Sequence, residues 1–190
     1  VRQKMGDARS SNAAGSPVFL NQHESGSFPD FVDQWLAAFG IPPHVRVRYE
    51  ADQAAMEANR RAYGVSWPRL AFTAARLVVS FGADFLDGWG ASVPQQLDFA
   101  DARANIATAP RAVYIGPRRT LTGLNSDQWI PCKPGSELAI AQALQGKLSP
   151  SQAAEASGVS ADVIGALAKE VASATPSLIV SGVRTGNARD

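Results

Sequence analysis

The sequence is poor in the side chains that bind soft metals. It has one cysteine, Cys132, and two histidines, His23 and His44, in 190 residues. One thiol cannot form an internal disulfide, and iron–sulfur clusters take about four thiolate ligands. The cysteine and histidines also match no familiar zinc spacing. We therefore expect no iron–sulfur cluster and no metal held by this chain alone through such ligands. We expect Cys132 to be buried and the histidines to be surface or structural residues.

Long apolar runs and an excess of charge are also absent. No run approaches the roughly 20 apolar residues that span a bilayer. The polar start, residues 1–15, lacks the continuous apolar core of a signal peptide. With 18 basic and 17 acidic residues, the formal charge is +1, which gives no overall attraction to nucleic acid or anionic membrane. The chain begins at Val1, which suggests a piece excised from a longer protein.

Common nucleotide-binding and nucleophile motifs are missing. There is no G-x-x-x-x-G-K-[ST] phosphate loop, and no G-x-G-x-x-G follows the first predicted strand. Gly88-Trp89-Gly90 is a lone G-x-G and a weak signal. Because no G-x-S-x-G elbow occurs, a nucleophile of the α/β-hydrolase type is not expected.

Strand and helix patterns alternate along the chain. RLVVSFG, residues 76–82, is typical of a buried central parallel strand. Other strands are predicted at 17–22, 44–50, 111–115 and 178–182, and helices at 28–39, 52–63, 94–106, 137–147, 150–156 and 160–173. This order predicts an α/β fold, doubly wound, with a mainly parallel sheet of about five strands and helices on both faces. We expect residues 1–16 to form a flexible lead-in and residues 17–190 to form a single αβα domain.

The first predicted helix has an apolar face at helical spacing. Its members are Phe28, Phe31, Val32, Trp35, Leu36 and Phe39. The last predicted helix pair, residues 150–173, allows a rival interpretation as a DNA-binding helix-turn-helix. Its second helix carries two acids against one lysine, so we disfavour this interpretation and expect its apolar residues in the core.

Two polar segments follow predicted strands, where ligands bind in such sheets. In GADFLDGWG, residues 82–90, Gly82 would let the backbone leave the sheet tightly or approach a ligand. Asp84 could accept hydrogen bonds from ribose hydroxyls or cap the next helix.

The second segment, residues 116–137, shows neither helical nor strand periodicity. Arg118 and Arg119 follow Pro117 and suit phosphate oxygens, although a solvated loop with paired arginines remains an alternative. Glu137 opens the next helix, where the dipole favours a carboxylate, and a carboxylate also matches the adjacent N–H donors of guanine.

Three pieces carry a family resemblance: VVSFGADFL, GPRRTLTGLNSD and KPGSE. In this order and spacing they resemble the molybdopterin oxidoreductases of the dimethyl sulfoxide reductase family, specifically their middle nucleotide-binding domain. That domain shows a strand ending in G-A-N, then D-P-R-x-T-x-T with a later A-D, then P-G-T-D before a helix. Here the acid before Pro-Arg is replaced by Gly116, and the amide at the strand end by Asp84. Both departures alter polar groups that would touch a nucleotide.

The resemblance implies binding of molybdopterin guanine dinucleotide in a full-length redox protein. Gly82 and Asp84 would approach the nucleotide. The ribose and phosphate would be lined by Pro117, Arg118 and Thr122. Glu137 would pair with guanine, and Gly135, in the turn just before it, would also belong to the cofactor site. The metal ligand and the cluster cysteines would lie outside this chain, so the fragment alone is not expected to turn over.

The resemblance also extends to the molybdopterin-like subunit of quinol-oxidising complexes, which keeps the fold without the pterin. The alternative function is therefore a cofactor-free scaffold in a membrane respiratory complex. Either implies the remaining domains of the same polypeptide and an iron–sulfur electron-transfer partner. A periplasmic or membrane-associated location is implied, with a cytoplasmic one left open.

Overall fold

The computed structural model of the chain describes residues 3, 19–22, 27–40, 46–49 and 53–182. They belong to two compact units, Val1–Ala51 and Asp52–Asp190, each described by itself. Apart from residue 3, the predicted flexible lead-in lies outside the described residues, as do His23 and His44. The domain bounds derived from the sequence stay a prediction.

The first unit contains a strand–helix–strand arrangement. Strands β1 (Phe19–Gln22) and β2 (Arg46–Tyr49) pair in parallel, and α2 (Phe28–Ala38) connects them in sequence. Val32 and Leu36 of α2 are buried, as the apolar periodicity predicts. Phe28 and Phe31 are 45% and 59% exposed, so the buried face is narrower than predicted. Both lie in the first turn of α2, where their rings pack on each other.

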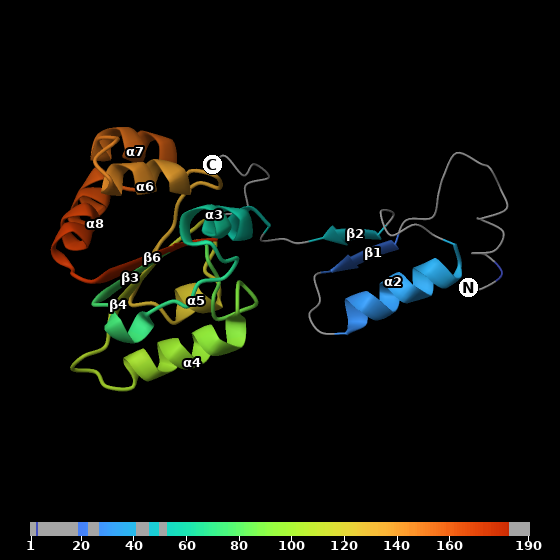
Figure 1. The fold of residues 1–190 in the computed structure, drawn as a ribbon. Coiled ribbons are helices and arrows are strands. Elements are labelled where there is room, and N and C mark those ends of the chain that lie inside the picture. The colour runs from blue at the N-terminus through green and yellow to red at the C-terminus, as the bar shows by residue number, and fades with distance from the viewer. Residues whose placement is uncertain (1–2, 4–18, 23–26, 41–45, 50–52, 183–190) are drawn as a thin grey trace. The chain divides into compact units, whose positions relative to one another are not determined.

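The second unit is built on a parallel sheet (Figure 1). Its four strands are β3 (Leu77–Phe81), β4 (Arg111–Ile115), β5 (Gln128–Ile130) and β6 (Ser177–Ser181), in the order β5-β4-β3-β6. The predicted fold class, a parallel sheet with helices on both faces, is confirmed. The expected five strands of one sheet are not: β1 and β2 form a separate two-stranded sheet, and β5 was not predicted.

Helices cover both faces of the four-stranded sheet (Figure 1). One face carries α6 (Glu137–Leu144), α7 (Pro150–Ser157) and α8 (Ala161–Ser173). The other face carries α4 (Ser92–Arg103) and the 3-10 turn η2 (Phe72–Ala74), and α3 (Gln53–Tyr63) packs against the same core through Ala55. Alternate residues of β3 pack on opposite faces of the sheet. Val79 packs in the core beneath α6, α7 and α8, and Val78 packs in the core beneath α4. All five residues of β3 are buried, so its predicted central position is confirmed.

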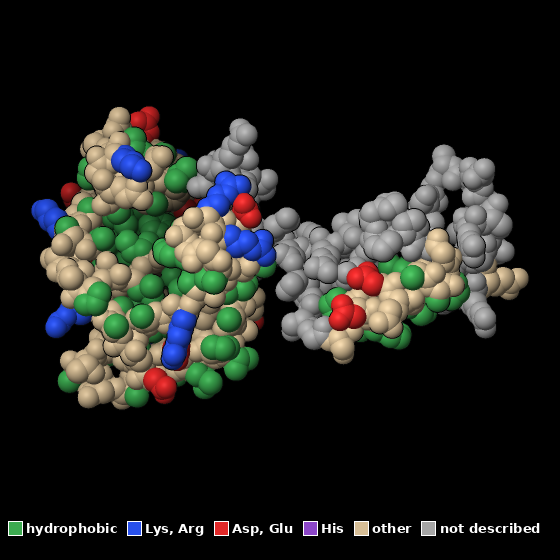
Figure 2. Space-filling view, in the orientation of Figure 1, with side chains coloured by type: hydrophobic (Ala, Val, Ile, Leu, Met, Phe, Trp, Pro, Cys, Tyr) green, Lys and Arg blue, Asp and Glu red, His purple; other side chains and the backbone are tan. Residues whose placement is uncertain are grey.

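The α7–α8 pair is part of the sheet packing. Ile164 and Leu167 of α8 are buried in the core, and Val163 and Val171 pack against it. Gly158 ends α7 in a left-handed conformation. On the face shown in Figure 2, the Lys and Arg side chains of the described residues are scattered and form no stripe along one helix. The expectation that the apolar residues of this helix belong to the core is confirmed.

Regular structure also occurs inside residues 116–137, where none was predicted. A short helix, α5 (Leu121–Leu124), begins after Thr120, whose side chain accepts a hydrogen bond from the Gly123 N–H. Strand β5 extends the sheet through only three pairs with β4. Elements this short are below the length at which apolar periodicity becomes a clear signal.

Gly182, directly after β6, offers a test of this packing. A Cβ added there would lie 2.6 Å from both Ala83 Cα and Trp89 Nε1. We expect Gly182→Ala to destabilise the fold by about 1–3 kcal/mol, because the Ala83 backbone cannot move aside cheaply. Urea unfolding measures this. In the control, Gly165→Ala in α8, the nearest atom is 3.9 Å away, so stability should be unchanged or higher. Equal unfolding midpoints for wild type and Gly182→Ala would contradict the packing described.

Candidate functional site

The predicted site residues lie on segments that leave the carboxyl ends of neighbouring strands. Residues 82–91 follow β3, residues 116–127 follow β4, and residues 131–137 follow β5. We call these three segments the loop cluster. Gly82 leaves β3 with a φ of 63°, a conformation that glycine adopts readily, and its N–H donates to Ile115 O at 2.9 Å. The first two segments therefore start side by side.

Reciprocal hydrogen bonds join the first two segments. The Thr122 N–H donates to Asp84 Oδ1 at 2.9 Å, and the Leu86 N–H donates to Thr122 Oγ1 at 3.0 Å. The Thr122 residue is only 1% exposed. A buried backbone N–H that loses its partner is costly, so these bonds hold the two segments in one arrangement.

Asp84 has a capping role, but at another helix than the sequence suggested. The next helix, α4, starts after Ala91 and has no side-chain cap. Asp84 instead accepts from an N–H in the first turn of α5, 38 residues further along the chain. The residue is half-buried, and its carbonyl also accepts from the Asp87 and Trp89 N–H groups. The ribose role of Asp84 stays a prediction.

The basic part of the second segment is exposed. Pro117, Arg118 and Arg119 all face solvent, and neither arginine forms an ion pair with another described residue. The Arg119 guanidinium lies over the Trp129 ring, 6.0 Å from its centroid. Arg118 is thus a cation whose guanidinium is available to an anionic ligand, as the sequence suggests.

The third segment presents a buried acid. Glu137, the first residue of α6, is 5% exposed, and its Oε2 atom is buried without a hydrogen-bond partner among the described residues. Gly135, two residues earlier, is exposed, and a Cβ added there would meet nothing within 4 Å. The buried position expected for Cys132 is confirmed. The pKa of the Cys132 thiol is raised mainly by burial and also by the negative charge of Glu137, and a hydrogen bond with Ser136 lowers it.

Tyr114, which the sequence did not identify as a site residue, is affected by charged residues of all three segments. It is 2% exposed, and burial is the main reason why its pKa is raised. A hydrogen bond with the Thr120 side chain and the charge of Arg118 lower that pKa, while the charges of Asp84 and Glu137 raise it. Three predicted charged residues, one from each segment, therefore act on one hydroxyl group. Its position near the carboxyl end of a strand was the signal that could have identified it.

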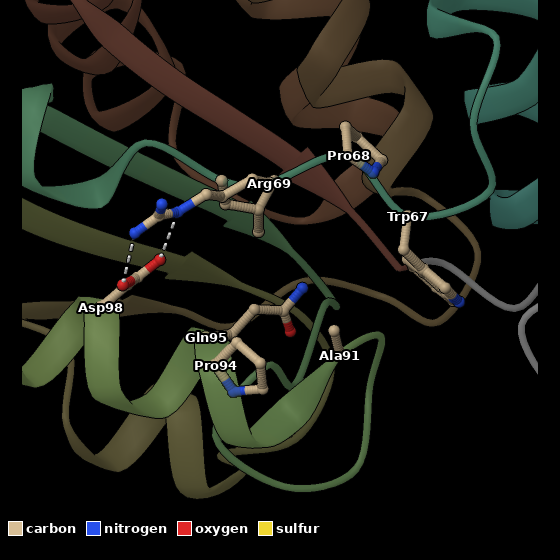
Figure 3. Close-up of a pocket in the computed structure, with 8 residues that line it drawn as sticks. Trp67, Pro68, Arg69, Ala91, Pro94, Gln95 and Asp98 are labelled. Carbon is tan, nitrogen blue, oxygen red and sulfur yellow. Dashed lines mark hydrogen bonds and ion pairs between the residues drawn. The ribbon is translucent and has the colours of Figure 1, made fainter. Parts of the chain in front are cut away.

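Two surface cavities lie beside α4, and none of the predicted site residues lines either. The first, about 230 Å³, is lined by Trp67, Pro68, Arg69, Leu70, Ala91, Pro94, Gln95 and Asp98. In Figure 3, Arg69 and Asp98 join across one side of this cavity, with N–O distances of 3.2 Å. The second, about 410 Å³, is lined by Leu86, Gln96, Phe99, Ala100, Arg103, Leu121 and Asn125.

Among the described residues, no three His, Cys, Asp or Glu side chains come together as a metal site would require. The loop cluster offers an exposed guanidinium and a buried carboxylate oxygen that lacks a donor. These groups suit a ligand with an anionic part and a part with N–H donors. The ligand-binding roles of Gly82, Asp84, Pro117, Arg118, Thr122, Gly135 and Glu137 stay predictions.

The fold defines a three-layer αβα protein with a parallel sheet. The chain is 27% identical over 128 residues to the molybdopterin-binding-like subunit of a menaquinone reductase from Nitratidesulfovibrio vulgaris, a match covering 55% of this chain and 18% of that protein. Its fold matches acetylene hydratase from Pelobacter acetylenicus with a TM-score of 0.60 and 16% identity, over 93% of this chain and 28% of that one. At this identity, the second likeness shows the fold alone. No protein-family model matches the chain.

The resemblance inferred from the three motifs is confirmed by these comparisons. The match spans 18% of the length of the menaquinone reductase subunit and 28% of the acetylene hydratase chain. Among the helices that the structure describes, none combines the length and apolarity needed to cross a membrane.

Asp127, at the end of the second segment, binds this segment to β4 and α4 through hydrogen bonds. Its carboxylate accepts two hydrogen bonds of 2.8 Å from Arg103 and one of 2.7 Å from the Ala112 N–H. The bond from Arg103 is the largest cause that lowers the pKa of Asp127 to about 2, and burial opposes it. The bond from Ala112 and the positive charges of Arg103 and Arg111 lower the pKa further.

This lowered pKa predicts a pH dependence of stability. Because the folded-state pKa lies below the ordinary value of 3.8, ionised Asp127 stabilises the fold above about pH 4, and this contribution disappears as the pH falls toward 2. We expect Asp127→Asn to lower the melting temperature at pH 7 and to have little effect at pH 2. Calorimetry at both pH values measures this, with the exposed Asp101→Asn as control. An equal loss at both pH values would contradict the role of the charge.

Proposed function

We propose that the loop cluster binds the guanine nucleotide end of a molybdopterin guanine dinucleotide in a longer oxidoreductase. The observation that carries this proposal is the buried Oε2 atom of Glu137, for which the described part of the chain supplies no hydrogen-bond partner. When bound, the cofactor would supply molybdenum-centred redox chemistry. This chain would contribute binding and orientation, not a catalytic side chain.

Glu137 is suited to recognise guanine. A buried polar atom without a hydrogen bond costs about 1–3 kcal/mol. The N-terminus of α6 stabilises the negative charge of the carboxylate, but the dipole supplies no hydrogen bond to Oε2. Guanine presents its N1–H and N2–H donors side by side, in the spacing of two carboxylate oxygens. Pairing with guanine would therefore satisfy the atom that the described residues leave unpaired.

Arg118 is suited to the phosphate part of the ligand. Its guanidinium is exposed, and a guanidinium bonds phosphate oxygens bidentately. The side chains of Thr122 and Asp84 each accept one hydrogen bond from a backbone N–H of the other loop. Their first role would be to position the backbone, and their other hydrogen-bonding positions would be available to the ligand. Gly82, Pro117 and Gly135 would let the backbone approach the nucleotide.

The sequence relative supports the wider assignment. The sequence relative is named as a subunit of a menaquinone reductase, so we propose that this chain also acts in a respiratory assembly with further domains or subunits. An iron–sulfur electron-transfer partner and a periplasmic or membrane-associated location belong to the same proposal.

A second candidate function is a cofactor-free scaffold in such an assembly. The relative's printed name, "molybdopterin-binding-like", supports it. So do Gly116, which replaces the family's acid, and Asp84, whose carboxylate is engaged by Thr122. In a scaffold, the same loops would serve packing alone, and guanine nucleotides would not bind.

Glu137→Gln separates these candidates. With the full-length protein and guanosine diphosphate as probe, we expect wild type to bind and Glu137→Gln to bind at least about tenfold more weakly, because a hydrogen bond to a charged group contributes about 1.5–3 kcal/mol. Isothermal titration calorimetry measures this.

The same substitution should not lower the melting temperature, since it removes a charge whose buried Oε2 atom has no partner among the described residues. Glu155→Gln, at an exposed position on α7, is the matched control and should change neither property. Wild type that ignores the nucleotide would favour the scaffold. Equal affinity of wild type and Glu137→Gln would refute the guanine contact.

A further inference from the structure

The outer sides of α4 and of the short helix α5 carry large apolar side chains in contact with solvent. Val93 and Leu97 of α4 are 64% and 62% exposed, and Leu121 and Leu124 of α5 are 46% and 57% exposed. A single exposed apolar residue is normal in a folded protein, whereas a contiguous group of them marks a contact surface. The significance of these side chains therefore depends on whether they form one surface.

A groove joins the apolar residues of the two helices. The cavity of about 410 Å³ beside α4 is lined by Ala100 of α4 on one side and by Leu121 of α5 on the other. Val93, Leu97 and Ala100 lie at i, i+4 and i+7, which is the spacing of one helix face. Leu124 follows Leu121 at i+3 and shares its face. We call these five residues, with the cavity between them, the α4–α5 groove.

The walls of the α4–α5 groove are fixed relative to each other. Phe99, which lines the cavity, is only 5% exposed and packs in the core beneath α4. The side chain of Gln96 donates from Nε2 to Leu86 O at 2.9 Å, and the Leu86 N–H donates to Thr122 Oγ1 in α5. Both helices are thus bound to the same loop. A partner would meet a groove that is already formed, which lowers the entropic cost of binding.

The unpaired charges at the α4–α5 groove are negative. Asp87 and Asp101 each directly follow a residue that lines the cavity, and both are exposed. Neither forms an ion pair with another residue that the structure describes. The cation that lines the groove, Arg103, is engaged by Asp127 through two hydrogen bonds of 2.8 Å. Complementarity of charge therefore favours a partner with basic side chains.

This charge pattern also argues against two other occupants. A second copy of the chain in a twofold interface would place the same surface against itself and bring acidic rims together. An anionic lipid surface attracts basic and not acidic segments. In contrast, an amphipathic helix inserts residues at i, i+3, i+4 and i+7 into an apolar groove of this kind. The sequence relative has much more chain than this one, since the match spans 18% of its length.

We propose that the α4–α5 groove is the docking surface for an amphipathic helix, with an apolar face and basic flanking side chains, that the remaining part of the longer polypeptide supplies. Leu97 and Leu121 would be the main contacts on the two walls. Docking would also stabilise the loop cluster, because Leu86 lines the groove and its N–H binds Thr122. The proposal rests on the longer polypeptide of the proposed function and is independent of guanine binding.

Photo-crosslinking of the full-length protein identifies the occupant. With p-benzoylphenylalanine at position 97, we expect a product of monomer mass that links this position to a basic amphipathic helix outside residues 1–190, identified by mass spectrometry. Position 106, where Ile106 is 95% exposed and does not line the groove, is the control and should not give this product. A link to a second copy, another subunit or a lipid, links found only within residues 1–190, or no link would each overturn the proposal. An equal yield from position 106 would do the same.

Thiol labelling tests the same groove with a smaller side chain. In the full-length protein we expect maleimide to label the Leu97→Cys variant at least tenfold more slowly than the Ile106→Cys variant, because the docked helix covers position 97. Wild type supplies the background from the buried Cys132, and melting curves verify that both variants are folded. Equal labelling rates would overturn the docking.

The charge of the partner is tested in the Leu97→Cys background. Adding Asp87→Lys should speed the labelling about threefold, since a rim charge contributes up to about 1 kcal/mol and its reversal repels a basic helix. An unchanged rate would overturn the basic character of the partner. These readouts need no nucleotide. A covered groove in a protein that binds no guanosine diphosphate would support the docking and contradict guanine binding, and an open groove in a protein that binds it would do the reverse.

Discussion

The reciprocal hydrogen bonds between Thr122 and the segment after β3 are the constraint on which the candidate site depends. Thr122 lies 36 to 38 residues after these partners in sequence. Its N–H donates a hydrogen bond to the Asp84 carboxylate, and its hydroxyl oxygen accepts one from the Leu86 N–H. Parallel strands bring their carboxyl ends to one edge of a sheet, but this alone leaves the following loops free to diverge. The paired bonds give the two loops a common geometry, and only then can groups on both contact one ligand.

The charged groups of the site are arranged around this joined pair of loops. Arg118 lies in solvent after β4, whereas Glu137 is buried at the start of α6. Both charges act on the hydroxyl group of Tyr114: Arg118 lowers its pKa and Glu137 raises it. A cation in water and an anion in a protein interior are suited to different parts of one molecule. The nucleotide that we propose as ligand would offer a phosphate end to the first group and a base end to the second.

The sequence predicts the parts of the fold that have strong periodicity. The buried strand β3 and the core face of α8 follow from apolar patterns that span many residues. The short elements α5 and β5 do not, because their formation depends on Thr120 as a cap and on pairing with β4. Motif spacing brought Asp84 and Thr122 into the site, but it could not show that they bind each other. The burial of Tyr114 beside Gly123, where an added Cβ would lie 2.9 Å from Tyr114 Cδ1, is likewise a matter of close packing that local sequence does not determine.

The proposed function requires that these converging loops hold a guanine nucleotide. Such a ligand can be detected by mass spectrometry of the small molecules released from the full-length protein, purified under native conditions from a molybdenum-replete host. We expect a pterin guanine dinucleotide in near-stoichiometric amount. Release of no guanine nucleotide under these conditions would contradict it and would leave the loops a role in packing alone.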